Sequence, residues 1–71
     1  MAGIRLTNIR RYGRFRHTET GKEVNLHTGK RPEEWDDWYF YYLRGSRVFV
    51  TSRALREWEQ VYHDLRGKFI K

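Results

Sequence analysis

The sequence predicts an α+β fold: a small antiparallel sheet of three to four strands, built from two hairpins and packed by one C-terminal α-helix. Residues 35–50, WDDWYFYYLRGSRVFV, hold aromatic and branched side chains on both sides of a glycine, which is typical of a β-hairpin. Residues 9–18 lack a helix stop signal and contain a mid-run glycine, which favours an extended strand. Residues 52–66 carry apolar side chains at spacings of three and four, as an amphipathic helix does.

The length of 71 residues and the absence of cysteine limit the classes of protein that fit. A chain of this size buries only about 60% of its unfolded surface, so its aromatic residues must supply much of the core. Without cysteine there is no disulfide and no thiol nucleophile. We expect an N-terminal arm over residues 1–8 and a single domain over residues 9–71. No apolar run is long enough for a signal sequence or a membrane span, so we expect a cytoplasmic protein without a membrane partner.

The first hairpin is expected from residues 9–18, a turn at residues 18–22 with Gly21 in the left-handed conformation, and a return strand at residues 22–27. Strict alternation would sort the first strand into two faces. One face would carry Arg10, Tyr12, Arg14 and Arg16, and the other Ile9, Arg11, Gly13, Phe15 and His17.

The second hairpin is expected from strands at residues 38–44 and 47–51, joined by a type II′ turn at Gly45 and Ser46. Such a turn sets Leu43 opposite Val48 and places Arg44 opposite Arg47. Both faces of this hairpin are apolar, so each needs a cover. We expect the helix to cover one face, and the rest of the chain or a partner to cover the other. One face holds Tyr39, Tyr41, Leu43, Val48 and Val50, and the other Trp38, Phe40, Tyr42 and Phe49.

The C-terminal helix is expected to begin at a cap formed by Thr51 or Ser52 and to end at Gly67. Its apolar stripe would pack on the sheet. A small antiparallel sheet backed by a C-terminal helix resembles, in architecture alone, the arm-site DNA-binding domains at the N-terminus of tyrosine recombinases. The resemblance implies nucleic-acid binding, although no motif in the chain carries it. The stripe consists of Leu55, Trp58, Val61, Tyr62 and Leu65.

The charge of the chain points to an acidic partner. The net charge is +6, and residues 1–16 contain five arginines and no acid. Arginines that alternate along a strand lie at intervals of roughly 6.6 to 7 Å, close to the spacing of phosphates along a nucleic-acid strand. The first interpretation is therefore a non-enzymatic module that binds DNA or RNA through phosphates; the structural alternative is a charged edge strand that resists aggregation. The candidate nucleic-acid-binding residues are Arg10, Tyr12, Arg14, Arg16, Arg44 and Arg47.

A second interpretation is a protein-binding adaptor or inhibitor, of the kind that small viral and mobile-element genomes encode. It would use an exposed aromatic sheet face and an acidic cluster, and the same face could form a homodimer. The cluster is also expected to pair with the arginines of the first strand or with a basic partner. Its residues are Glu33, Glu34, Trp35, Asp36, Asp37 and Trp38.

Catalytic and metal-binding patterns are missing from the sequence. His17, His27 and His63 have no spacing typical of a zinc site, and the acidic cluster lacks the pattern of a calcium loop. No nucleophile-elbow sequence and no glycine-rich phosphate loop occur. We therefore expect no enzyme activity, no metal, no cofactor and no small-molecule substrate.

Overall fold

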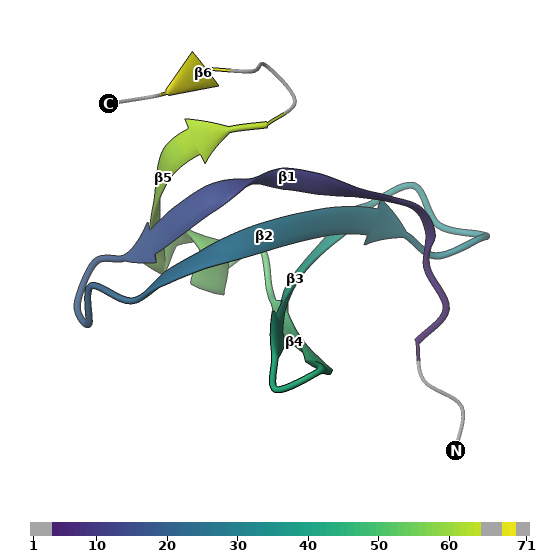
Figure 1. Cartoon of the computed structure of the whole chain (residues 1–71). Helices are drawn as coiled ribbons and strands as arrows, with labels where there is room; N and C mark the ends of the chain where they lie inside the picture. Colours follow the sequence, from purple (N-terminus) through teal and green to yellow (C-terminus); the bar gives the residue numbers. More distant parts are fainter. Residues whose placement is uncertain (1–3, 65–67, 70–71) are drawn as a thin grey trace.

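The computed structural model describes residues 4–64 and 68–69. Within them the chain forms one antiparallel sheet in the strand order β4-β3-β2-β1-β5-β6, with the 3-10 turn η1 between β4 and β5 (Figure 1). The first four strands form a meander, and β5 returns to pair with the free edge of β1. The elements are β1 (Thr7–His17), β2 (Glu23–Lys30), β3 (Asp37–Leu43), β4 (Ser46–Val50), η1 (Ala54–Glu57), β5 (Trp58–His63) and β6 (Lys68–Phe69).

The predicted C-terminal α-helix is wrong, because the described part of that segment forms η1 and then β5. Helix-like hydrogen bonds form only at the start of the predicted helix. The Thr51 hydroxyl accepts a hydrogen bond from the Ala54 N–H at 3.0 Å, and the Thr51 carbonyl accepts one from the Leu55 N–H at 2.8 Å. The backbone then becomes extended at Trp58 (φ −114°, ψ 134°). Leu65 and Gly67, which the prediction also used, lie outside the described residues. Without the helix, the architectural resemblance to the arm-site domains no longer holds.

The pairing of β1 explains why this segment becomes a strand. β5 runs antiparallel to β1 from the pair Gly13–His63 to the pair His17–Trp58. Without β5, one edge of the eleven-residue β1 would present unpaired backbone groups. The aromatic and β-branched residues of β5 also suit a strand. Pairing of β5 with β1, which lies some forty positions earlier in the chain, therefore outweighs the helical spacing of the apolar residues within this segment.

No helix in the described part of the chain is long and apolar enough to cross a membrane.

Two irregularities break the alternation of β1. Its register against β2 shifts between Thr7 and Arg10, where Asn8 has a φ of +54°, and again between Arg11 and Gly13. The second shift leaves Tyr12 as an extra residue, so the side chains beyond it change face. Tyr12 consequently lies on the same face as Phe15, with their ring centroids 5.6 Å apart. The predicted single alternation from Ile9 to His17 is therefore wrong.

The inner face of the sheet carries the main core. Phe15, Leu26 and Val50 are buried there. The 3-10 turn and β5 supply the cover that the helix was expected to give. The partly buried residues packed against the three are Tyr12, Val24, Tyr39, Tyr41, Ala54, Leu55 and Trp58.

The outer face also contains a buried aromatic residue. Phe40 is 0% exposed and lies in ring contact with His27, Tyr42 and Phe49. The segment at residues 4–6 runs beside this face: Leu6 is buried, and its Cβ lies 3.4 Å from the position that a Cβ on Gly29 would occupy. Most of the outer aromatic face is thus used for packing inside the chain.

The turn of the β3–β4 hairpin lies one residue earlier than predicted. Arg44 and Gly45 both have positive φ values, +53° and +82°, which is the type I′ rather than the type II′ geometry. The register sets Leu43 opposite Ser46 and Tyr41 opposite Val48. Each partner moves by two positions, so the predicted division of side chains between the two faces is confirmed even though the turn and the pairing were wrong.

Candidate nucleic-acid interface

The arginines of β1 do not form the single row that the sequence predicted. The shift at Tyr12 turns this ring into the core, against Phe15, Tyr39 and His63. Arg14 and Arg16 remain together on the outer face, beside Asn25 and Glu23 of β2. Arg10 lies apart from them, and its guanidinium donates to the Asn8 carbonyl at 3.0 Å. Two of the four predicted β1 positions, Arg10 and Tyr12, therefore do not lie with the other two.

The outer arginines of β1 form ion pairs with carboxylates. Arg14 donates to Glu23 at 2.8 Å, and Arg16 donates to Glu59 at 3.1 Å. Arg11, which was assigned to the core face, forms an ion pair with Asp64. The three arginine side chains are 42–50% exposed and their acidic partners 22–38%, and such surface pairs contribute only about 0–1 kcal/mol. The pairs lower the positive potential along β1, but a phosphate could displace them.

The end of the β3–β4 hairpin presents arginines in a different setting. Arg44 lies in the turn and Arg47 pairs with Tyr42, so the predicted opposition of the two arginines is wrong. Arg47 donates to the Ile4 carbonyl at 3.0 Å, and its guanidinium carbon lies 5.1 Å from the centre of the Phe40 ring. Among the described residues, neither arginine is paired with a carboxylate. Tyr42, whose side chain shares the outer face with Arg47, is 51% exposed.

His27 lies on the outer face between the arginines of β1 and the aromatic residues of β3. Its ring stacks on Phe40 at 5.5 Å and meets Tyr42 edge-on at 5.2 Å. Burial lowers the pKa of His27 below its ordinary value of 6.5, and the positive charge of Arg11 lowers it further, whereas Asp64 acts in the opposite direction. His27 is therefore neutral at pH 7 and packs as an aromatic ring.

This pKa shift predicts a pH dependence of stability. Because the folded pKa lies below the unfolded value, the unfolded chain binds the proton more readily as the pH falls below about 6.5. The stabilisation from neutral His27 should be complete above that pH and decline as the pH falls toward the folded pKa. We expect His27→Gln to have a flatter stability profile than the unmodified protein between about pH 7 and 5, measured by urea unfolding. An NMR titration that placed the pKa of His27 at or above 6.5 would contradict this.

The acidic cluster lies on the loop at residues 31–36 and at the start of β3. It does not bind the arginines of β1, as had been expected; Glu34 instead accepts a hydrogen bond from the Trp38 indole at 3.1 Å and lies 3.6 Å from Arg31. Trp35 is 92% exposed, with the Lys30 ammonium 5.4 Å from its ring centre. The loop therefore holds its own local contacts and presents one large ring to solvent.

Sequence reasoning missed a pair of hollows between the two hairpins. One has a volume of about 370 Å³ and the other about 340 Å³, and both are lined by Lys22 and Tyr41. Trp58 lines the second hollow, and Tyr42 and Arg14 line the first. These residues come from three strands, β1, β3 and β5, and from the connection between β1 and β2, so no local spacing in the sequence could have indicated them.

The described residues contain no group of three or more side chains that could hold a metal ion. In comparisons with known proteins, no protein-family model, no curated protein and no solved structure matches the chain.

Proposed function

We propose that this protein is a small non-enzymatic module that binds nucleic acid mainly through phosphates, centred on the end of the β3–β4 hairpin. The observation that carries this proposal is the state of Arg44 and Arg47. Both are exposed and, in the part of the chain that the structure describes, unpaired with any carboxylate, and Arg47 shares its face with the half-exposed ring of Tyr42. Phosphates attract arginines that lack an acidic partner more strongly than arginines already neutralised.

Other arginines would extend this surface. Arg14 and Arg16 lie on the same outer face and would exchange their carboxylates for phosphates, whereas Arg10 lies apart and would contribute less. Tyr12 is core in this arrangement and belongs to the scaffold. Because phosphate contacts carry little sequence information, we expect a modest preference for sequence.

Salt dependence tests the proposal. Four phosphate contacts would give a slope of log affinity against log salt of roughly −2.8 for single strands and −3.6 for duplex. Replacing Arg44 and Arg47 by glutamine should make the slope shallower by roughly 1.4 to 1.8 and weaken binding at low salt. Fluorescence anisotropy with labelled single- and double-stranded DNA and RNA measures both effects.

The matched control is the double variant Arg53→Gln and Arg56→Gln. These two arginines are exposed next to and within η1, and the variant removes the same net charge. Equal losses in the two double variants would mean that total charge, and not the hairpin end, sets the affinity. A slope near zero for the unmodified protein would rule out phosphate binding altogether.

A second candidate function, a protein-binding adaptor or inhibitor, has one specific observation in its favour. Trp35 projects from the acidic loop with 92% of its surface exposed, and exposed aromatic residues are frequent anchors of protein interfaces. Glu33, Asp36 and Asp37 around it are exposed and would suit a basic partner. Failure of every nucleic acid to bind at low salt would favour this function over the first.

A further inference from the structure

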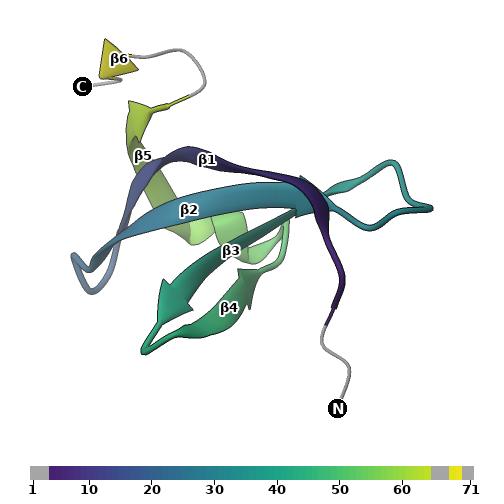
Figure 2. The ribbon, with the colours of Figure 1, turned by 45° about the vertical axis from the view of Figure 1, so that its right-hand side comes forward.

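The two hairpins separate from each other, which opens the space between them. The ladder between β2 and β3 joins only residues His27 to Lys30 with Phe40 to Asp37. Beyond it, the start of β2 and the end of β3 diverge, and the β3–β4 hairpin turns away from the β1–β2 hairpin (Figure 2). The two hollows occupy this region and meet at Lys22 and Tyr41. We call them together the splayed groove.

The chemistry of the splayed groove is aromatic and cationic. Tyr41 lies between the hollows, with Tyr42 at the first and Trp58 at the second. The Lys22 ammonium lies 5.5 Å from the centre of the Tyr41 ring. Glu23 is the one carboxylate among the described lining residues, and it already accepts a hydrogen bond from Arg14. The groove therefore carries positive charge beside ring faces and edges.

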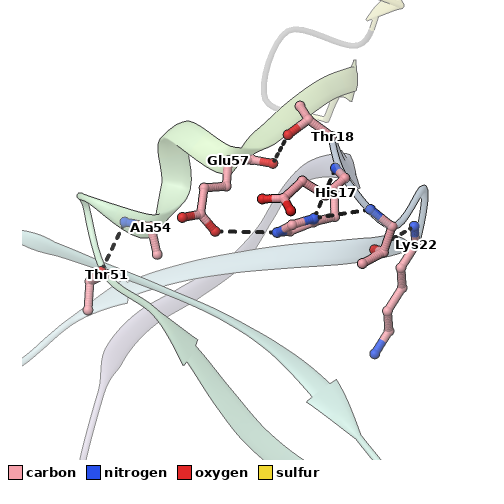
Figure 3. A network of polar contacts seen from close by, with 8 residues as sticks. His17, Thr18, Lys22, Thr51, Ala54 and Glu57 are labelled. Carbon is pink, nitrogen blue, oxygen red and sulfur yellow. Dashed lines mark hydrogen bonds and ion pairs between the residues drawn. The ribbon is translucent and has the colours of Figure 1, made fainter.

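The wall of the groove at residues 18–22 is held in place. His17 accepts hydrogen bonds at Nδ1 from the main-chain N–H groups of Glu19 and Thr20, at 3.3 and 3.4 Å. The other ring nitrogen, Nε2, lies 3.4 Å from a carboxylate oxygen of Glu57 (Figure 3). Thr18 donates to the Glu57 carbonyl through both its N–H at 3.0 Å and its hydroxyl at 3.1 Å. These hydrogen bonds tie the turn to η1, and the backbone of Lys22 is held by bonds to His17 and Thr20.

We propose that the splayed groove binds the unpaired bases of single-stranded nucleic acid, an inference that rests on the proposed function. Stacking of bases on aromatic side chains beside cations is the usual way in which proteins hold single strands. In a duplex the faces of the bases are stacked on one another, so they cannot contact Tyr41 or Trp58. Each hollow has a volume within the range of sites for small organic groups, about 300 to 1,000 Å³. The diverging strand edges leave main-chain donors and acceptors beside the bases.

The net charge of +6 favours a nucleic acid over the main competing occupant. Proline-rich peptides also dock in grooves lined by aromatic residues. An uncharged proline-rich peptide gains no electrostatic attraction from Lys22, whereas the phosphate next to a stacked base is attracted by the Lys22 ammonium. The proposal therefore commits to single-stranded nucleic acid, and the peptide becomes an outcome of the test.

Two variants test the groove through affinity. Tyr41→Leu should weaken binding of a 12-nucleotide oligothymidine by about 5- to 150-fold and change affinity for a duplex by less than about twofold. Lys22→Gln should make the salt slope for the single strand shallower by about 0.7. Lys30→Gln is its matched control, because Lys30 also lies over an aromatic ring, Trp35, but outside the groove. Circular dichroism and thermal unfolding check that each variant is folded.

A direct readout separates the groove from the rest of the surface. In the variant Trp35→Phe with Trp38→Phe, Trp58 is the single tryptophan left of the three. Oligothymidine should quench its emission in parallel with the rise in anisotropy. Binding without quenching, with Tyr41→Leu unaffected, would overturn the groove and leave the proposed function standing. No binding of any nucleic acid would overturn both, and quenching by a proline-rich peptide alone would assign the groove to a protein partner.

Discussion

Replacing Gly13 by valine is expected to lower the free energy of unfolding by about 3 kcal/mol or more. A Cβ on Gly13 would lie 2.2 Å from the carbonyl oxygen of Tyr62 and 2.8 Å from the amide nitrogen of Gln60. The first of these atoms belongs to the backbone of β5, which can yield only by leaving β1. The substitution therefore acts on the contact that turns the predicted helix into a strand.

Urea unfolding followed by tryptophan fluorescence measures this effect. Gly13→Ala should lie between the unmodified protein and Gly13→Val, because its smaller side chain still meets the Tyr62 carbonyl. Gly21→Ala serves as the control: its φ is +74°, but a Cβ there has open space, so we expect a cost of about 1–2 kcal/mol from backbone conformation alone. Unchanged stability of Gly13→Val would mean that β5 does not pair with β1.

Phe40→Ala is expected to cost about 3–5 kcal/mol, the usual range for removing a fully buried phenylalanine. Phe40 lies on the outer face of the sheet, where a hairpin that meets water would carry polar side chains. It is nevertheless fully buried, among His27, Tyr42, Phe49 and the guanidinium of Arg47. A chain of 71 residues has a total stability of only about 4–11 kcal/mol. The variant should therefore be close to unfolding at 37 °C.

Tyr42→Ala is the matched control for Phe40→Ala, since the two residues lie on the same strand face. Tyr42 is 51% exposed, and we expect its loss to cost about 1 kcal/mol or less. Thermal unfolding monitored by circular dichroism compares the two variants. Similar losses of stability in the two variants would show that the outer face is not a second core, and that face would again be a candidate binding surface.

The structure changes which part of the basic sequence is suited to binding. The arginines concentrated near the N-terminus suggested that β1 was the binding strand, but Arg11, Arg14 and Arg16 are neutralised by Asp64, Glu23 and Glu59. Two of these acids lie more than forty positions away in the sequence. Arg44 and Arg47, at the hairpin end, have no carboxylate partner among the described residues, although the sequence had suggested them only as secondary contacts. Charge composition suggests a class of partner, and the tertiary ion pairs change which arginines we propose for its binding.

The sequence by itself determined the features that depend on neighbours along the chain. Two-residue alternation placed Tyr41 and Phe40 on opposite faces of the second hairpin, and Gly21 marked the first turn, with its φ of +74°. Alternation is a property of the extended backbone, so even the error in the turn at Arg44 and Gly45 did not disturb the faces.

Only the tertiary structure decided that residues 52–64 form a 3-10 turn and a strand, and that three of the β1 arginines pair with carboxylates. A stripe at spacings of three and four is compatible with a helix, but Trp58, Val61 and Tyr62 are also good strand residues. The unpaired edge of β1 resolved that ambiguity by offering β5 a ladder of backbone hydrogen bonds. The extra residue at Tyr12 likewise follows from packing against Phe15 and Tyr39. Such choices depend on contacts between distant segments, whose free energy no local pattern contains.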